Sequence, residues 1–343
     1  MPGTKPTILL IYTGGTIGMI KDFETGALRN FNFTELLEYI PELKLLDCDI
    51  DTTSFPAPID SSNMNPAYWA DLATIIETNY EDFDGFVVLH GSDTMSYTAS
   101  ALSFMLENLG KPVIFTGSQL PIGDLRTDAK ENLITSIQIA SLREKGRSVI
   151  SEVGLYFEYK LYRANRTTKI NAEHFEAFAS LNYPALVESG VHLSVNRDAL
   201  YAPNRRKKVR VHKMMNSNII LLKMFPGINE ATVRHILSFS EIEGIVLETY
   251  GSGNVTSENW FISLLKEKIE AGIPVINVTQ CSGGSVAMGL YETSVGLKKI
   301  GVISGKDCTT EAALAKLMYL LGQKISRGSF KTIFETSLRG EMI

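Results

Sequence analysis

Short apolar segments alternate with longer segments of helical periodicity over the first half of the chain. The apolar segments carry no polar face, which is typical of buried strands in a parallel sheet, and they predict strands at residues 7–12, 85–90, 113–116 and 153–157. The intervening segments predict helices at residues 67–79, 95–109 and 128–142. Asp128 and Glu131 have the spacing of a capping box for the third helix. This alternation predicts an α/β fold with a doubly wound, mainly parallel sheet and right-handed crossovers.

The alternation stops near Val195 and resumes after Lys213. Within the break, Asn204-Arg-Arg-Lys-Lys-Val-Arg210 is strongly basic, and its setting favours a solvated linker over a nucleic-acid or localisation signal. Beyond it the pattern predicts strands at 218–223, 244–248 and 274–278, and helices at 230–239, 258–271 and 310–323. We therefore expect a larger N-terminal domain at 1–194 carrying the catalytic residues, a linker at 195–213, and a smaller C-terminal α/β domain at 214–343.

Composition and charge narrow the class of protein. The 343 residues are 44% hydrophobic and 21% charged, and the net charge is 33 − 38 = −5, which argues against a nucleic-acid binder that relies on overall positive charge. No apolar run approaches the roughly 18 residues that span a bilayer, and the start of the chain shows no export signal, so we expect a cytoplasmic protein without a membrane partner. The three cysteines and five histidines show no metal-ligand spacing, and we predict no metal or other cofactor.

The residues that follow the predicted strands carry the candidate chemistry, because ligands of open α/β sheets bind beyond the carboxyl ends of the strands. These segments are Thr13-Gly-Gly-Thr-Ile-Gly18, Asp60-Ser-Ser62, His90-Gly-Ser-Asp-Thr-Met95, Thr116-Gly-Ser-Gln119 and the run from Tyr162 to Lys169. The first is neither a dinucleotide-binding nor a P-loop motif, so its spacing alone predicts a tight turn. Together the segments offer hydroxyls, carboxylates and one lysine.

A hydroxyl nucleophile needs a group that takes its proton, and a lysine oriented by an aspartate is the available base. Simpler interpretations exist for single residues: Asp93 and Thr94 can cap the next helix, and Lys169 can be a surface lysine. The residues themselves therefore indicate hydrolysis or acyl transfer by a hydroxyl, without naming the substrate.

Four of these motifs, in this order, resemble those of the type I (cytoplasmic) bacterial asparaginases: Thr13–Gly18, His90–Met95, Thr116–Gln119 and Asn165-Arg-Thr-Thr-Lys169. The resemblance continues through Tyr250-Gly-Ser-Gly-Asn254 and Thr279-Gln-Cys281 to Leu338-Arg-Gly-Glu341. It implies an L-asparagine amidohydrolase of asparagine catabolism that releases L-aspartate and ammonia. It also implies a homotetramer built as a dimer of dimers.

The resemblance assigns roles position by position. It implies that Thr16 is the nucleophile and that Ser92, Asp93 and Lys169 relay protons. It implies substrate binding by Gly15, Asp60, Ser61, Ser62, Gly91, Ser118 and Asn254, with Asn254 reaching the active site of a neighbouring subunit. Backbone N–H groups near Thr16 and Ser92 are expected to hold the oxyanion.

Two positions depart from the family pattern. The second catalytic threonine of the family is Ser92 here, which keeps the hydroxyl and loses a methyl group. The loop after the nucleophile, residues 21–28, lacks the usual tyrosine and has Ala27 at about its place. We predict that Tyr291 supplies the missing phenol, and a packing role for Tyr291 is the alternative.

Three other functions remain open on the sequence alone. A dual asparaginase/glutaminase differs by one methylene of substrate, worth only about 1–3 kcal/mol in an apolar pocket. An amidotransferase subunit would carry an extra N-terminal domain, whereas this chain enters its first predicted strand at Thr7. A non-catalytic amino-acid-binding protein would be expected to have lost Thr16, Asp93 or Lys169, and all three are present.

Overall fold

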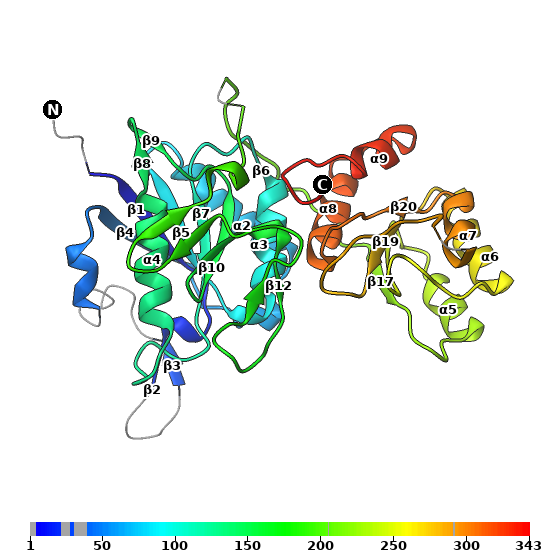
Figure 1. Ribbon diagram of the computed structural model, residues 1–343, viewed down its shortest axis with the longest axis horizontal. Helices are drawn as coiled ribbons and strands as arrows, with labels where there is room; N and C mark the ends of the chain where they lie inside the picture. The colour runs from blue at the N-terminus through cyan, green and yellow to red at the C-terminus, as the bar shows by residue number, and fades with distance from the viewer. Residues whose placement is uncertain (1–4, 22–27, 31–39, 205, 291) are drawn as a thin grey trace. The chain divides into compact units, whose positions relative to one another are not determined.

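The four apolar strands predicted in the first half of the chain lie side by side in one sheet of the computed structural model (Figure 1). They are β1 (Thr7–Tyr12), β5 (Gly85–Leu89), β7 (Val113–Thr116) and β10 (Val153–Phe157). Each is parallel to its neighbours, so their carboxyl ends meet along one edge of the sheet. The structure describes residues 5–21, 28–30, 40–204, 206–290 and 292–343.

Four further strands complete this sheet, whose order is β15-β14-β11-β10-β7-β5-β1-β4. At one edge, β4 (Asp49–Ser54) is parallel to β1. At the other, β11 (Lys160–Arg163), β14 (Val187–Ser189) and β15 (Leu193–Val195) are antiparallel. The predicted doubly wound, mainly parallel sheet is therefore confirmed, with an antiparallel margin that the sequence pattern did not predict.

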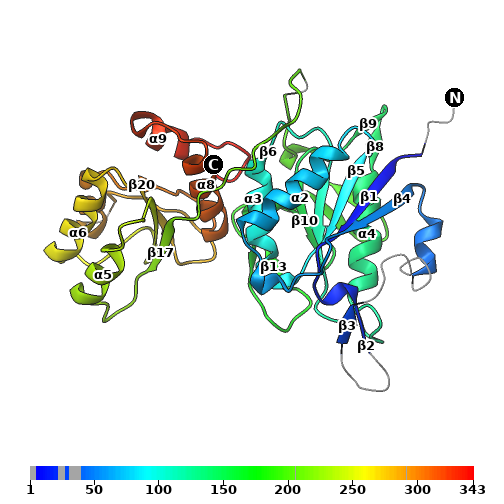
Figure 2. The same cartoon turned by 180° about the vertical axis from the view of Figure 1, so that it is seen from behind.

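Helices cover both faces of the sheet. Figure 1 shows α4 (Ala129–Ser141) in front of it, and Figure 2 shows α2 (Pro66–Thr78) and α3 (Met95–Met105) on the opposite face. The helix α3 ends four residues before the predicted Leu109. The chain leaves the helix there because β6 (Leu106–Glu107) pairs with β16 (Arg210–Val211).

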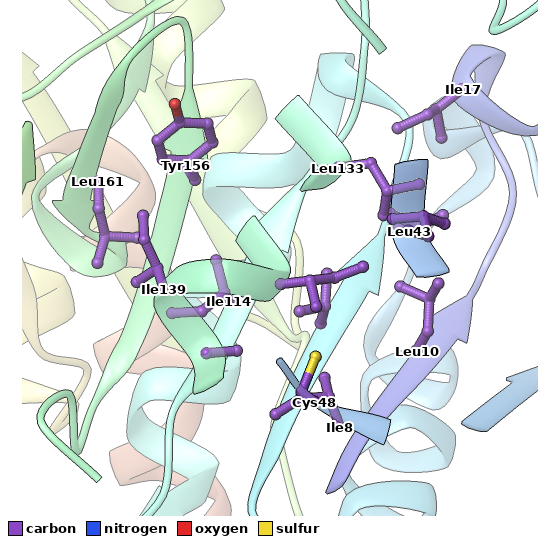
Figure 3. Close-up of a cluster of buried hydrophobic side chains, with 14 of the residues drawn as sticks. Ile8, Leu10, Ile17, Leu43, Cys48, Ile114, Leu133, Ile139, Tyr156 and Leu161 are labelled. Carbon is purple, nitrogen blue, oxygen red and sulfur yellow. The ribbon is translucent and has the colours of Figure 1, made fainter. Parts of the chain in front are cut away.

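One hydrophobic core of this unit lies between the sheet and α4 (Figure 3). Strand residues Ile8, Leu10 and Ile114 and helix residue Leu133 have no exposed surface. Burial of such a side chain contributes about 1.5–3 kcal/mol. This packing fixes α4 on the central strands, and with it the loops that leave their carboxyl ends.

The predicted capping box at the start of α4 is wrong, although the helix begins where expected. Asp128 makes no side-chain cap hydrogen bond. Its carboxylate instead accepts hydrogen bonds from the backbone N–H groups of Gln119 and Leu120. Glu131 accepts from Tyr156 and Thr135. Tertiary partners have taken both carboxylates away from the helix end.

The chain divides into two units, Met1–Lys213 and Met214–Ile343. The predicted linker, 195–213, falls in the first unit, where β16 joins it to β6. The described part of this unit also contains short antiparallel strand pairs: β2 (Met19–Lys21) with β3 (Leu28–Asn30), β8 (Arg143–Glu144) with β9 (Arg147–Ser148), and β12 (Thr168–Lys169) with β13 (Phe178–Ala179).

The second unit is a parallel four-stranded sheet with helices on both faces. Its strands are β17 (Ile219–Lys223), β18 (Gly244–Thr249), β19 (Val275–Thr279) and β20 (Ile303–Ser304), in that order. Its helices are α5 (Glu230–Leu237), α6 (Asn259–Glu270), α7 (Glu292–Ile300), α8 (Thr310–Gly322) and α9 (Arg327–Phe334). Side chains of α5, α6 and α7 form one core with β17, β18 and β19, and α8 contacts β18 and β19.

None of the helices in the described ranges is long and apolar enough to cross a membrane.

Candidate active site

Two glycine backbones bring three strand-end segments into contact. Gly15, at φ 93°, lies so close to Gly91 that a Cβ on it would be 2.5 Å from the Gly91 Cα and N. A Cβ on Gly91 would be 2.6 Å from the Ser61 Oγ. Only glycine readily adopts the positive φ of Gly15, and only glycine allows the two backbones to come this close. The segments that carry Thr16, Ser61 and Ser92 therefore meet at the carboxyl ends of β1 and β5.

Backbone hydrogen bonds hold the segment that leads to Thr16. The Thr13 backbone N–H and hydroxyl both donate to the Leu89 carbonyl, each at 3.0 Å, and the Thr13 carbonyl accepts from the Ile59 N–H at 2.8 Å. Thr16 then opens a short 3₁₀ turn, Thr16–Gly18, and is itself half-buried. The predicted nucleophile thus lies on a turn tied to both flanking segments.

Ser92, Asp93 and Lys169 lie together, as the resemblance implied. The Lys169 Nζ, on β12, donates to the Asp93 Oδ1 at 2.7 Å and to the Ser92 Oγ at 2.9 Å. The lysine side chain is 18% exposed, while that of Asp93 is 68% exposed. The cluster is therefore an ion pair whose carboxylate faces solvent, next to a hydroxyl that can receive or pass on a proton.

Asp60 is held as an exposed carboxylate. Its Oδ1 accepts from the Ser62 backbone N–H at 2.9 Å and from the Ser62 hydroxyl at 2.7 Å. These two hydrogen bonds lower the pKa of Asp60 below its ordinary value. The group is therefore ionised at neutral pH, which suits an ammonium group of a ligand.

Thr94 supports this region in a way that the sequence did not predict. It makes no cap hydrogen bond to α3, contrary to the expectation of a helix cap. Its hydroxyl donates instead to the carbonyl of the buried Ser61 at 2.7 Å. The expected cap is wrong, because the hydroxyl is directed to the Ser61 carbonyl and not to the first turn of the helix.

The remaining predicted site residues are placed less directly. Ser118 is buried, and its hydroxyl donates to the Leu120 carbonyl at 2.6 Å, so only the hydroxyl oxygen can accept from a ligand. Asn254 belongs to the second unit, where its backbone pairs with Tyr250 after β18. Its predicted role in a neighbouring subunit stays a prediction. Tyr291 and Ala27 lie outside the described residues.

His90 and Gln119 also support the site, and the sequence singled out neither. His90 is fully buried, and its Nδ1 lies 2.7 Å from the Gly91 carbonyl. Burial lowers its pKa to about 4, so the ring is neutral at pH 7 and the Nδ1 carries the hydrogen that it donates. The Gln119 side chain contacts Ser92. The available signal for both was position, since each lies in a strand-end segment beside a predicted site residue.

Within the ranges that the structure describes, no group of three or more histidine, cysteine, aspartate or glutamate side chains could hold a metal ion. The groups gathered here are hydroxyls, carboxylates and one ammonium group. They can bind a zwitterion, supply a hydroxyl nucleophile and transfer protons.

Comparison with known proteins agrees with this arrangement. Residues 7–201 match the family model "Asparaginase, N-terminal", and residues 218–334 match "Glutaminase/Asparaginase C-terminal domain". L-asparaginase 1 of Escherichia coli K12 is 41% identical over 339 residues, 98% of either chain. The crystal structure of L-asparaginase I from Vibrio cholerae has a TM-score of 0.89 at 40% identity and covers 99% of this chain and 100% of its own. The thermostable L-asparaginase from Thermococcus kodakarensis has a TM-score of 0.88 at 29% identity and covers 98% of this chain and 99% of its own.

Proposed function

The chain belongs to the asparaginase family, and from that premise we propose that it hydrolyses the side-chain amide of L-asparagine to L-aspartate and ammonia, with the Thr16 hydroxyl as nucleophile. The observation that carries the proposal is the cluster of Ser92, Asp93 and Lys169, with Nζ distances of 2.9 and 2.7 Å, next to the turn that presents Thr16. A hydroxyl nucleophile, a proton-transfer group and a charged orienting partner are the parts that such a reaction needs.

Binding of the substrate follows from charge. L-asparagine is a zwitterion, and the exposed Asp60 carboxylate, ionised at neutral pH, attracts its α-ammonium group. The Asp93 side chain is also exposed. The family resemblance implies that it helps Asp60 to bind the α-ammonium group. Ser61, Ser62, Ser118 and the backbone at Gly15 and Gly91 supply hydrogen-bonding groups for the carboxylate and the amide.

The proposed reaction has two steps, formation of an ester with Thr16 and hydrolysis of that ester. The Thr16 oxygen attacks the amide carbon, and the proton that Thr16 loses is relayed by the cluster of Ser92, Asp93 and Lys169 to the amide nitrogen, which departs as ammonia. This leaves an ester between Thr16 and the substrate's side-chain carbonyl. Water then attacks the ester, and the proton that the water loses is relayed by the same cluster to the Thr16 oxygen, which leaves as the restored hydroxyl. Backbone N–H donors at the developing oxyanion would each contribute about 3 kcal/mol to the transition state.

Three finer proposals accompany this one. The first is a homotetramer, assembled as a dimer of dimers, in which Asn254 completes the site of a neighbouring subunit. The second is a cytoplasmic location, supported by the resemblance to type I enzymes. The third is that Tyr291 replaces the phenol absent from the loop at 21–28. Dual action on glutamine is the alternative substrate range, because one methylene changes binding by only about 1–3 kcal/mol.

The test is ammonia release from L-asparagine and from L-glutamine, with Thr16→Ala and Thr16→Ser prepared in parallel. We expect Thr16→Ala to lose at least about 10³-fold in kcat because the nucleophile is gone, and Thr16→Ser to keep measurable turnover. Thermal unfolding of each variant checks that the fold is retained. A folded Thr16→Ala protein with more than a tenth of the original kcat would exclude Thr16 as the nucleophile.

A further inference from the structure

The side-chain amide of Gln119 lies between Ser92 and the segment that follows Lys169. Its Oε1 accepts a hydrogen bond from the Ser92 hydroxyl at 3.1 Å. Its Nε2 donates to two backbone carbonyls, those of Ala172 and His174, both at 3.1 Å. The neutral side chain of Gln119 thus contacts both Ser92 and the segment that follows Lys169.

The partners determine which way the amide faces. Backbone carbonyls only accept, so the NH₂ group of Gln119 must face Ala172 and His174, and its carbonyl oxygen must face Ser92. The Lys169 ammonium group only donates, and it points at the same Ser92 oxygen from 2.9 Å. Of these two neighbours, only the Gln119 Oε1 can accept the Ser92 hydrogen.

This orientation matters for proton transfer. A serine oxygen has one hydrogen and two lone pairs. With the hydrogen on Gln119 and one lone pair receiving Lys169, the second lone pair can accept a hydrogen bond from the nucleophile or from water and so orient the O–H group that reacts. If the hydroxyl rotated, its hydrogen would point at the incoming donor and prevent that hydrogen bond.

The backbone beneath Gln119 is rigid. Its N–H donates to both oxygens of Asp128, at 3.1 and 2.9 Å, and Asp128 is only 6% exposed. Asn132, on α4, donates to the Gly117 carbonyl at 3.0 Å and to Asp128 at 3.2 Å. Because α4 is packed on the central sheet, Gln119 projects from a fixed base rather than from a free loop.

The segment that follows Lys169 has hydrogen bonds among its own residues, such as those from the Ile170 N–H to the Ala177 carbonyl and from the His174 N–H to the Asn171 side chain. The hairpin that carries the lysine consists of two pairs, Thr168 with Ala179 and Lys169 with Phe178. Residues 170–177 connect the strands, and the two carbonyls bound by Gln119 lie in this connection. Gln119 thus holds the connection that follows the lysine's strand as well as the serine hydroxyl.

We propose that Gln119 is a positioning residue of the hydrolytic site, which holds the Ser92 hydroxyl hydrogen away from the reacting atoms and fixes the connection after Lys169. This rests on the proposed function only in that Ser92 takes part in proton transfer.

The first experiment compares Gln119→Leu and Gln119→Glu with Gln138→Leu, which makes the same change on an exposed position of α4. We expect Gln119→Leu to lower kcat for L-asparagine about 10- to 100-fold while KM changes less than about threefold, because geometry rather than binding is lost. Gln119→Glu keeps an acceptor for Ser92 but cannot donate to the two carbonyls, so it should be impaired as well. Full activity in either Gln119 variant, or an equal loss in Gln138→Leu, would overturn the proposal.

A double-variant cycle separates positioning from general structural damage. In a Ser92→Ala background the hydroxyl that Gln119 orients is absent, so adding Gln119→Leu should cost much less than it does alone. If the two losses multiply in full, Gln119 does not act through Ser92.

Hydrogen exchange supplies a readout that is independent of activity. Gln119→Leu should speed amide exchange within 170–177, where the Ile170 N–H bonds the Ala177 carbonyl at 2.8 Å, and Gln138→Leu should not. Unchanged exchange would show that Gln119 does not fix the connection after Lys169. Thr16→Ala in the same series tells the two failures apart: an active Thr16→Ala contradicts the proposed mechanism, whereas an inactive one with an unaffected Gln119→Leu contradicts only this inference.

Discussion

Each unit of the protein contains a close lysine–carboxylate pair, and the two pairs differ in almost every other respect. In the first unit, Lys169 lies 2.7 Å from Asp93, and these side chains are 18% and 68% exposed. In the second, Lys316 pairs with Glu341, and both side chains are 0% exposed. In these two pairs the same functional groups therefore lie at a solvent-facing edge in one unit and in a buried interior in the other.

The two pairs also differ in how many of their hydrogen-bonding groups are already used. The Lys316 ammonium group donates to Glu341 and also to the Phe334 and Thr336 carbonyls, at 2.6 and 2.7 Å, which uses all three of its hydrogens. The Glu341 carboxylate accepts from backbone N–H groups of Leu338 and Arg339. Such a pair has no capacity left for a ligand or a transferred proton. Its structural role is to tie the last residues of the chain to α8.

The exposed pair should affect turnover and leave stability nearly unchanged. We expect Lys169→Met to lower kcat about 10²- to 10⁴-fold, because a proton-transfer group is lost. The free energy of unfolding should change by less than about 1 kcal/mol, the usual contribution of an exposed ion pair. Steady-state kinetics and urea unfolding measure the two, with Lys130→Met, at a 45% exposed side chain, as the control. A kcat within tenfold of the original would show that Lys169 is not part of the chemistry.

The buried pair should show the opposite behaviour. Lys316→Met leaves the Glu341 charge buried without its cation, so we expect a loss of about 3–5 kcal/mol in unfolding free energy, measured by urea titration. The kcat of the protein that remains folded should stay within about twofold. Adding Glu341→Gln to Lys316→Met should recover part of the loss, because the buried charge is then removed. A loss below about 1 kcal/mol from Lys316→Met would contradict the assigned role.

A third carboxylate, Glu158, is half-buried and has no ion-pair partner within the described residues. Burial, and then the charges of Asp128, Glu131 and Glu176, raise its pKa to about 7 from an ordinary value of 4.5. The folded state therefore holds this proton more tightly than the unfolded state, and its contribution to stability is lost as pH rises from about 4.5 to about 7.

Removal of this charge should therefore stabilise the protein at higher pH. We expect Glu158→Gln to melt above the parent protein at pH 8, by a few degrees at most since the group is partly solvated, with a smaller difference at pH 5. Thermal unfolding at the two pH values is the measurement, and Glu188→Gln, on an exposed residue of β14, is the control. An advantage that is larger at pH 5 than at pH 8 would contradict the raised pKa.

The sequence predicted the parallel centre of the fold well and its margins poorly, for one physical reason. Strands buried on both faces are apolar throughout, and their ends were placed to within a residue. The edge strand β4 reads Asp-Ile-Asp-Thr-Thr-Ser and is half-exposed, so its pattern resembles a loop. The antiparallel strands β14 and β15 are three residues each, which is too short to show a period.

The site divides in a similar way. Residue type and position at strand ends pointed to hydroxyls, a carboxylate and a lysine, but Ser92 and Lys169 are 77 positions apart, and only the family resemblance joined them before the structure did. The expected caps at Thr94 and Asp128 were wrong because both side chains bond groups outside the helix: Thr94 donates to the Ser61 carbonyl, and Asp128 accepts from N–H groups of residues 119 and 120. Gln119 was overlooked because a neutral amide has no distinctive chemistry until its neighbours are known.

The contact between Gly15 and Gly91 has a practical consequence for redesign of the substrate range. Part of the boundary of this site is main chain, so a library of side chains at either glycine would yield misfolded variants rather than new specificities. Diversity belongs instead at an exposed position outside the proton-transfer cluster, such as Ser62, where a new side chain meets solvent and not another backbone. A screen for altered preference between asparagine and glutamine should begin by randomising such a position.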